Sequence, residues 1–415
     1  MTIINIGDEL LLGQVVNTNS AFIGQKLALK GIKVSEIITI GDDRKEIADA
    51  LSYCFEKDNF VITTGGLGPT KDDITKEVIC EHFNKRLVRD AETLEWVSEL
   101  LASRGMELTE INRRQADVPE GCSVLKNTLG TAPGLWIQEG ENVLVALPGV
   151  PFETEKLLCD EVIPRMETFV NNGKRLIYRV LMCNGISESN LSDKLGNFEQ
   201  KLPPDIKLAY LPTPGILRLR LTLHGNSEDE PLLDRHFEKL KEEVGNLAFS
   251  YEDRKMEEVV GELLKKAKKT VAVAESCTGG RISELVTSVP GSSEYYKGGV
   301  VAYNNSIKRN ILSVREDNLK KHGAVSEMVV SDMALNIMEL FDTDYSVSTS
   351  GIAGPGGGTD EKPVGTVWIA VATPTRLTTR LFNFGKNTGR KQIVERAANA
   401  ALDMLRTEIL KDFKK

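Results

Sequence analysis

The sequence predicts an α/β fold divided among three domains: a parallel-sheet N-terminal domain, a small α+β module and an α/β C-terminal domain. Three observations lead to this prediction. The chain has 415 residues, the length of two or three ordinary domains. Short apolar strands alternate with helical segments near both ends of the chain, an order typical of sheets covered by helices. The stretch between them has a different pattern, so we place the domains at 1–170, 171–250 and 251–415.

The first domain is expected to begin as strand, helix, strand, helix and strand. Hydrophobic periodicity and turn residues place these elements at 2–6, 19–30, 33–40, 44–56 and 60–64. This order implies a mainly parallel sheet with helices on both faces. Ligands of such sheets bind beside the carboxyl ends of the strands. Because Gly7, Asp42, Asp43 and the loop 65–73 all follow strand ends, we expect a ligand there.

The other two domains are separated from the first by a polar stretch at 171–174, which we take as a boundary. The module is expected to contain a strand, a helix, two strands and a helix, at 176–183, 188–195, 206–212, 216–223 and 231–244. The last domain is expected to contain a helix at 256–268, strands at 270–274, 299–302 and 345–349, and a long closing helix at 390–410. Thr388 is the predicted N-cap of that closing helix.

The composition is that of a globular protein, with 41% hydrophobic and 27% charged residues, which argues against disorder. No apolar run reaches the roughly 18–20 residues that a membrane helix needs. The first residues lack the basic region and cleavage site of a signal peptide. The six cysteines are scattered, without a CxxC pair or zinc-ligand spacing. We therefore expect a cytoplasmic protein that has no membrane partner.

The charge distribution argues against a nucleic-acid partner. The formal net charge is −8, and it is uneven: residues 251–415 hold 24 basic and 21 acidic side chains, whereas the remainder holds 28 and 39. Neither part carries the basic excess that binding to a phosphate backbone requires. A small anionic ligand in the last domain remains compatible with these charges.

The loop TTGGLGPTKDD gives the first domain a candidate phosphate site. Gly65, Gly66 and Gly68 would let backbone N–H groups approach a phosphate, and the helix that follows favours negative charge there. Asp72 and Asp73 would hold a cation that bridges two phosphates. The alternative is an ordinary glycine-rich turn whose aspartates cap a helix. Two further Gly/Pro-rich loops, at 127–134 and 147–153, strengthen the phosphate interpretation because they also adjoin strand-like runs.

The last domain carries a candidate serine nucleophile with a lysine as its base. Ser276 follows a strand, and a serine becomes a nucleophile beside a lysine that burial keeps neutral, such as Lys308. The glycine-rich loop after Ser350 would present N–H groups to an oxyanion. Arg390 stands in the first turn of a helix, where its charge opposes the helix dipole, so an anionic partner is favoured. The alternatives are an N-cap for the serine and surface charges for Lys308 and Arg390.

Cys277 is the rival nucleophile in the same loop. A cysteine nucleophile is usually activated by a histidine, and none of the four histidines, at 82, 224, 236 and 322, lies in these motifs. We therefore rank Cys277 below Ser276 and interpret it as a small buried neighbour.

These motifs resemble the competence/damage-inducible protein CinA family over essentially the whole chain. GDELLLG, GGLGPTKDD, NTLGTAPG and LPGVPFE resemble its N-terminal domain, which is similar to molybdopterin-binding proteins. AESCTGG, KGGVVAYNNSIK, GAVSEMV and SGIAGPGGGTDEKPVGTVWIA resemble its C-terminal domain, which is similar to stand-alone nicotinamide mononucleotide deamidases. The middle module resembles the family's KH-like insert. It lacks a GXXG loop, so we interpret it as structural or dimer-forming.

The resemblance implies that the last domain hydrolyses nicotinamide mononucleotide to nicotinate mononucleotide and ammonia without a cofactor. Ser276 matches the family's nucleophile and Lys308 its general base. Tyr303 and Ser350 match polar site residues, although the family usually has threonine at the latter position. The substrate-binding residues implied are Thr278, Gly279, Gly280, Asn305, Gly351, Gly354 and Arg390, the last as the phosphate contact.

For the first domain the resemblance implies hydrolysis of ADP-ribose to AMP and ribose 5-phosphate with a metal ion, either divalent or potassium. The implied metal or water ligands are Asp43, Asp72, Asp73 and Glu153, and the implied phosphate contacts are Gly65, Gly66, Gly68 and Asn127. Asp8 and Glu9 are left as residues that fix the first turn. A molybdopterin-like or nucleotide ligand is the alternative for this pocket.

As a whole, the resemblance implies a homodimeric enzyme of pyridine-nucleotide recycling with two active sites. One alternative is that only the deamidase works. Another, from a different class, is a scaffold without catalysis that is associated with competence or DNA damage.

Overall fold

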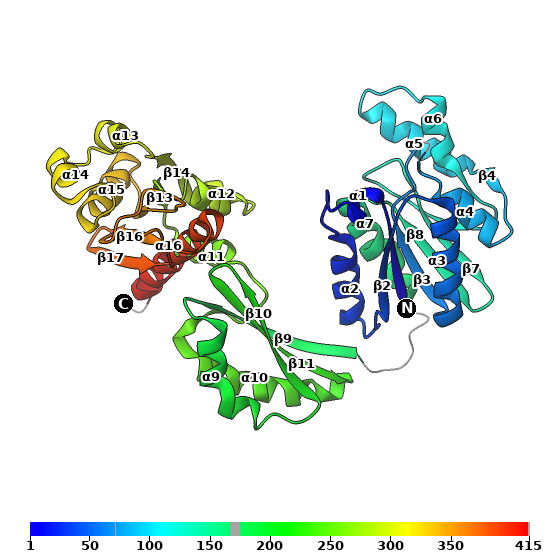
Figure 1. The fold of residues 1–415 in the computed structure, drawn as a ribbon, viewed down its shortest axis with the longest axis horizontal. Helices are drawn as coiled ribbons and strands as arrows, with labels where there is room; N and C mark the ends of the chain where they lie inside the picture. The colour runs from blue at the N-terminus through cyan, green and yellow to red at the C-terminus, as the bar shows by residue number, and fades with distance from the viewer. Residues whose placement is uncertain (71, 167–174, 414–415) are drawn as a thin grey trace. The chain divides into compact units, whose positions relative to one another are not determined.

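The computed structural model describes residues 1–70, 72–166 and 175–413 (Figure 1). They form two compact units, Met1–Ile177 with His224–Glu228 and Tyr178–Leu223 with Asp229–Lys415. The predicted boundary at 171–174 and residue 71 of the glycine-rich loop lie outside the described residues. Within those residues, no helix has the length and apolar character needed to cross a bilayer.

The first unit is built on a six-stranded, mainly parallel sheet. Its order is β2-β1-β3-β8-β7-β6. The first four strands run parallel, and β7 pairs antiparallel with both β8 and β6. The strands are β1 (Thr2–Ile6), β2 (Glu36–Ile40), β3 (Phe60–Thr64), β6 (Ser123–Leu125), β7 (Gly134–Glu139) and β8 (Asn142–Leu147). The predicted order of the first elements and the parallel sheet are confirmed.

Helices cover both faces of this sheet (Figure 1). On one face, α3 (Arg44–Lys57) and α4 (Thr75–His82) pack into a core with Ile4. On the other, α2 (Asn19–Leu29) and α7 (Pro151–Leu157) pack into a core with Ile3. The remaining elements are α1 (Asp8–Leu11), β4 (Leu87–Arg89), α5 (Ala91–Ser103), α6 (Glu110–Arg113), η1 (Arg114–Ala116), β5 (Asp117–Pro119), η2 (Leu158–Val162) and α8 (Ile163–Met166).

The second unit opens with an antiparallel sheet of order β10-β11-β9-β12, beside two amphipathic helices. Along β11, buried and more exposed residues alternate, as expected for a sheet with one covered face. The elements are β9 (Arg175–Asn184), α9 (Glu188–Glu199), β10 (Ile206–Thr213), β11 (Ile216–Gly225), η3 (Ser227–Asp229), α10 (Glu230–Val244), η4 (Gly245–Leu247) and β12 (Ala248–Ser250).

The rest of the second unit is a five-stranded mixed sheet of order β14-β13-β15-β16-β17. The first three strands are parallel, and β16 pairs antiparallel with both β15 and β17. One face packs against α11, α12 and α16, and α15 covers the other. The elements are α11 (Met256–Ala267), β13 (Val271–Glu275), α12 (Arg281–Thr287), η5 (Ser292–Glu294), β14 (Tyr296–Val301), α13 (Asn305–Asn310), α14 (Glu316–His322), α15 (Glu327–Leu340), β15 (Tyr345–Gly351), β16 (Thr366–Thr373), β17 (Arg376–Asn383) and α16 (Arg390–Phe413).

The two sheets of the second unit share one core, because Val180 and Phe249 belong to the same buried cluster as Val260 and Ile393. The multidomain α/β prediction is therefore confirmed. The predicted N-cap of α16 is wrong. The hydroxyl of Thr388 donates to the Phe384 carbonyl instead, and the carbonyl of Gly389 accepts the first helical bond, from the Ile393 N–H.

Candidate functional site

The centre of the C-terminal site is a serine–lysine pair. Ser276 follows β13, and Lys308 lies on α13, which follows the neighbouring parallel strand β14. The Ala302 N–H donates to the Glu275 carbonyl, so the ends of both strands are tied together. As a result, Lys308 Nζ lies 2.8 Å from Ser276 Oγ and 2.6 Å from the Ala302 carbonyl oxygen.

The environment of Lys308 favours the neutral amine. The side chain is 1% exposed, and this burial lowers its pKa to about 8 because desolvation penalises the charged form. A neutral amine has two N–H groups and one lone pair. In the protonated form Nζ donates to both Ser276 Oγ and the Ala302 carbonyl. Once neutral, it can keep the bond to Ala302 and turn its lone pair to the Ser276 hydroxyl. This arrangement suits proton transfer from the serine.

A buried carboxylate holds the loop that carries Ser276. Glu275 is fully buried, and its carboxylate accepts bonds from the N–H groups of Gly280, Ile282 and Ser283 and from the Ser283 hydroxyl. These donors belong to the start of α12, where unpaired N–H groups and the helix dipole favour an anion. The carboxylate therefore fixes both ends of the serine loop.

The opposite wall of the pocket comes from the loop after β15. Ser350, Gly351 and Gly354 line a cavity of about 260 Å³ together with Ser276 and Lys308. The Ser350 hydroxyl donates to the Ala324 carbonyl at 2.7 Å, which joins this wall to the loop before α15. Ser350 therefore holds two walls of the cavity in place.

Arg390 and Tyr303 stand together at the same cavity, and Asn305 lines it as well. The guanidinium of Arg390 donates to the Tyr303 hydroxyl at 2.7 Å and to the Gly354 carbonyl at 2.8 Å. Both side chains are exposed, so a ligand can reach them. The pair presents a positive charge and a hydroxyl, which are groups that recognise phosphate.

Three residues of the serine loop lie outside the cavity lining, contrary to expectation. The Thr278 hydroxyl is paired with that of Thr349 at 2.7 Å. The N–H groups of Gly279 and Gly280 donate to the Ser276 carbonyl and the Glu275 carboxylate. Their polar groups stabilise the turn, and direct contact of these three residues with substrate stays a prediction.

Some residues that line the cavity were left out of the predicted site or were ranked low in it. Ala324 and Val325 form part of the wall, and the motif GAVSEMV was the signal for them. Cys277 also lines it, but burial raises the pKa of its thiol to about 12. A thiol with such a pKa is a poor nucleophile at neutral pH, which keeps Ser276 as the candidate.

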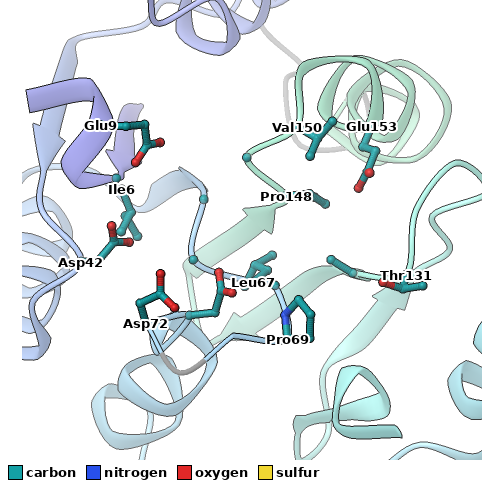
Figure 2. A pocket seen from close by; sticks show the side chains of 17 residues that line it. Ile6, Glu9, Asp42, Leu67, Pro69, Asp72, Thr131, Pro148, Val150 and Glu153 are labelled. Carbon is teal, nitrogen blue, oxygen red and sulfur yellow. The ribbon is translucent and has the colours of Figure 1, made fainter. Parts of the chain in front are cut away.

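The N-terminal pocket lies at the carboxyl ends of the parallel strands, as predicted. It has a volume of about 420 Å³ and is lined by residues that follow β1, β2, β3 and β8 (Figure 2). In Figure 2, Asp42 and Asp72 lie on the side of the pocket away from Glu153 and Thr131. Asp73 lines the pocket too.

The glycines of this pocket are required by its geometry. Gly65 has a φ of +106°, and a Cβ there would lie 2.1 Å from the Ile6 carbonyl oxygen. Gly66 has a φ of +66°, and a Cβ on Gly68 would collide with the Asp73 carboxylate. Only glycine fits the first two positions without strain, and all three line the pocket.

The pocket is acidic on the side of β1 and β2. The Asp8 N–H donates to the Asp42 carboxylate at 3.0 Å, which ties the two strand ends together. Burial raises the pKa of Asp42, and the neighbouring charges of Glu9, Asp8 and Asp72 raise it further. Glu9 and Asp42 line the pocket although they were not among the predicted ligands. The motif GDELLLG was the available signal for Glu9, and a position directly after a strand was the signal for Asp42.

Two predicted residues of this pocket are corrected. Asp43 does not line the pocket, because its carboxylate caps α3 by accepting bonds from the N–H groups of Lys45 and Glu46. Asn127 is occupied within its own loop and donates to the carboxylate of Glu153 at 2.7 Å. Glu153 does line the pocket, and burial raises its pKa.

The protein alone does not form a complete metal site there. Among the residues that the structure describes, no three His, Cys, Asp or Glu side chains are grouped closely enough to hold one ion. Mg²⁺ bound to nucleotides commonly uses one or two carboxylates, with phosphate and water as its other ligands. Asp72 and Asp73 fit that partial role.

Three family descriptions match successive parts of the chain. "Probable molybdopterin binding domain" matches residues 2–168, "Damage-inducible protein CinA KH domain" matches 178–250, and "CinA C-terminal domain" matches 253–409. Together they span both candidate sites.

Full-length relatives agree with these matches. A "CinA-like protein" of Flavobacterium psychrophilum is 41% identical, covering 100% of this chain and 99% of its own, and one of Chloroherpeton thalassium is 42% identical, covering 97% and 98%. The crystal structure of a competence/damage inducible protein from Agrobacterium tumefaciens is 34% identical over 37% of this chain and 92% of its own, with a TM-score of 0.36. On its length, order of domains and identity to these relatives, the chain belongs to the CinA family.

Proposed function

We propose that the C-terminal domain hydrolyses the carboxamide of nicotinamide mononucleotide to nicotinate mononucleotide and ammonia. The observation that carries this proposal is the buried Lys308 amine, 2.8 Å from the Ser276 hydroxyl, in a cavity that also holds Arg390. A neutral lysine can take the proton of a neighbouring serine, so this nucleophile needs neither a metal nor a histidine. The substrate phosphate would pair with Arg390 and Tyr303.

The reaction proceeds through an acyl-enzyme. Lys308 takes the proton of Ser276 as Oγ attacks the carboxamide carbon, and N–H groups of the loop after β15 stabilise the oxyanion. The protonated Lys308 side chain then gives this proton to the carboxamide nitrogen, the C–N bond breaks, and ammonia leaves. Water then attacks the ester with Lys308 as the base, which releases the carboxylate and restores the serine.

Ammonia release from nicotinamide mononucleotide by the purified protein, without added metal, tests this proposal. Ser276→Ala and Lys308→Met are each expected to lower kcat by at least about 10³-fold, since nucleophile and base act as a unit. Lys297→Ala, which changes an exposed lysine on β14, is the matched control and should retain activity. Turnover in folded Ser276→Ala close to that of wild type would refute the proposal.

A second activity is supported by the N-terminal pocket. We propose that it hydrolyses ADP-ribose to AMP and ribose 5-phosphate with a metal ion that binds together with the pyrophosphate. Glycines 65, 66 and 68 provide close backbone approach, and carboxylates surround the same space. The metal would polarise the pyrophosphate and supply activated water. Asp72 and Asp73 would be its protein ligands.

Product formation from ADP-ribose, with Mg²⁺, Mn²⁺ or K⁺ added in turn, tests this second activity. Asp73→Asn is expected to lower it by about 100-fold or more, while Asp49→Asn on α3, away from the pocket lining, should not. If no metal yields AMP, the pocket is a binding site for a molybdopterin-like or nucleotide ligand, and the deamidase stands alone.

We further propose that the protein is a homodimer and that nucleic acid is not its partner. Light scattering tests the first statement, because a monomeric mass contradicts it. Binding to duplex DNA at physiological salt tests the second, and the acidic net charge predicts no measurable binding.

A further inference from the structure

A third cavity lies within the second unit, between the four-stranded module and the C-terminal sheet. Its volume is about 600 Å³, larger than that of either candidate active site. The module contributes the loop before α9 and the hairpin between β10 and β11, and the other wall is β17 with α16. We call it the hairpin cavity, and neither proposed reaction uses it.

The walls of the hairpin cavity are held in place. Gly215 in the hairpin has a φ of +88°, and a Cβ there would lie 3.3 Å from the Arg396 Cα, so the hairpin sits directly on α16. The amide of Asn399 donates to the Pro214 carbonyl at 3.3 Å. The shared core beneath these contacts includes Val180 and Met404. The cavity is therefore a feature of a packed unit.

One side of the hairpin cavity is apolar and aromatic. The rings of Phe382 and Phe384 are stacked with centroids 5.5 Å apart and planes 9° from parallel. Ile186, Ile216 and Met404 extend this surface around the same space. A flat ring of a ligand would gain burial against such a wall.

The charged groups of the cavity favour an anion. Arg396 lines it, and its guanidinium makes a long hydrogen bond, 3.5 Å, to the Phe384 carbonyl. Arg380 lies over the Phe382 ring at 4.8 Å. Asp403 and Glu188 also line the cavity. Asp403 is paired with Arg406 at 2.8 Å, and Glu188 is exposed to solvent. Arg396 is therefore the lining cation that a phosphate could pair with.

We propose that the hairpin cavity binds a small planar anion of the nucleoside monophosphate class, with its ring against the phenylalanine wall and its phosphate on Arg396. The volume suits a ligand of this size, because small-molecule sites commonly span about 300–1,000 Å³. The proposal is independent of both active-site assignments, since the three cavities share no lining residue.

Photolabelling of the full chain with an azido analogue of AMP, followed by peptide mapping, tests the proposal. Label is expected within 184–217, 380–384 or 396–404, which leaves out Arg390 of the candidate deamidase site. Arg396→Met should lower that labelling by about tenfold, whereas Arg235→Met, an exposed arginine on α10, should not. AMP should compete, and adenosine and ribose 5-phosphate should compete poorly, because each lacks one of the two groups recognised.

Three results would overturn the proposal. The first is label confined to peptides of the two candidate active sites. The second is an equal loss of labelling in the two arginine variants when both remain folded by circular dichroism. The third is competition by ribose 5-phosphate as strong as that by AMP, since it would show that the aromatic wall contributes nothing.

Discussion

The pKa of a single amine sets the expected pH dependence of the deamidase. Burial lowers the pKa of Lys308 to about 8, and only the neutral amine accepts the serine proton. At pH 7 about a tenth of the molecules hold this form, and the fraction rises with pH. We therefore expect kcat/KM to rise about tenfold per pH unit below 8 and to level off above it. A pH profile that is flat between 6 and 8 would contradict Lys308 as the base.

Arg390 is expected to act on binding more than on chemistry. It reaches the cavity from the start of α16 and is already oriented by Tyr303 and Gly354. A charged hydrogen bond contributes about 1.5–3 kcal/mol, so Arg390→Ala should raise KM for nicotinamide mononucleotide by about 10–150-fold with little change in kcat. Nicotinamide riboside, which lacks the phosphate, is the internal control. An equal effect on both substrates would remove Arg390 from phosphate recognition.

The sequence predicted which residues lie close together where the order of the strands decides it. It did not predict which side chains are already occupied by a local hydrogen bond. Ser276 and Lys308 follow adjacent parallel strands, so the sequence pattern already places them at one edge. Asp42 and Asp43 are neighbours in the same turn, and a difference in backbone direction sends one to the pocket and the other to a helix cap. The side-chain amide of Asn127 is a group that could bind a phosphate, but it already donates to the Ala132 carbonyl and to the Glu153 carboxylate.

At the scale of elements, the junction of β13 and α12 depends on one carboxylate. Glu275 accepts hydrogen bonds from three backbone N–H groups, those of Gly280, Ile282 and Ser283. Glu275→Ala would remove this acceptor from donors that are buried or partly buried, and an unpaired buried donor costs about 1–3 kcal/mol of stability. We expect a lower urea midpoint and lost ammonia release. Glu284→Ala, which removes an exposed carboxylate of the same helix, is the control. An unchanged midpoint in Glu275→Ala would show that the helix start does not need this anion.

The turn after β3 is expected to tolerate no side chain. Gly65→Ala would force a Cβ against the end of β1, in addition to the strain of a positive φ. Gly140→Ala is the matched control, because Gly140 also has a positive φ, +61°, but open space around it. Gly140→Ala should lower the free energy of unfolding by about 1–2 kcal/mol through backbone strain. Gly65→Ala should lower it further and should abolish turnover of ADP-ribose. Equal thermal shifts in the two variants would contradict the collision.

Element boundaries were predictable where a strong stop signal coincided with the hydrophobic pattern. β1 and β3 begin and end at the predicted residues because glycines follow them directly. The strand predicted at 33–40 begins only at Glu36, since hydrophobic pattern alone does not show where pairing with β1 starts. The cap of α16 was missed because the Thr388 hydroxyl bonds backwards to the Phe384 carbonyl.

At the scale of the whole molecule, the two proposed activities are expected to be separable. The two active-site cavities share no lining residue and belong to different compact units. Substitutions that act locally should therefore affect one reaction and leave the other, since distant sites with no shared partners behave additively. We expect Lys308→Met to stop ammonia release with turnover of ADP-ribose unchanged, and Asp73→Asn to do the reverse. Assays of both substrates on each variant and on the double variant measure this. A loss of both activities in either folded single variant would mean that the units are coupled, and the double variant would then give the coupling energy.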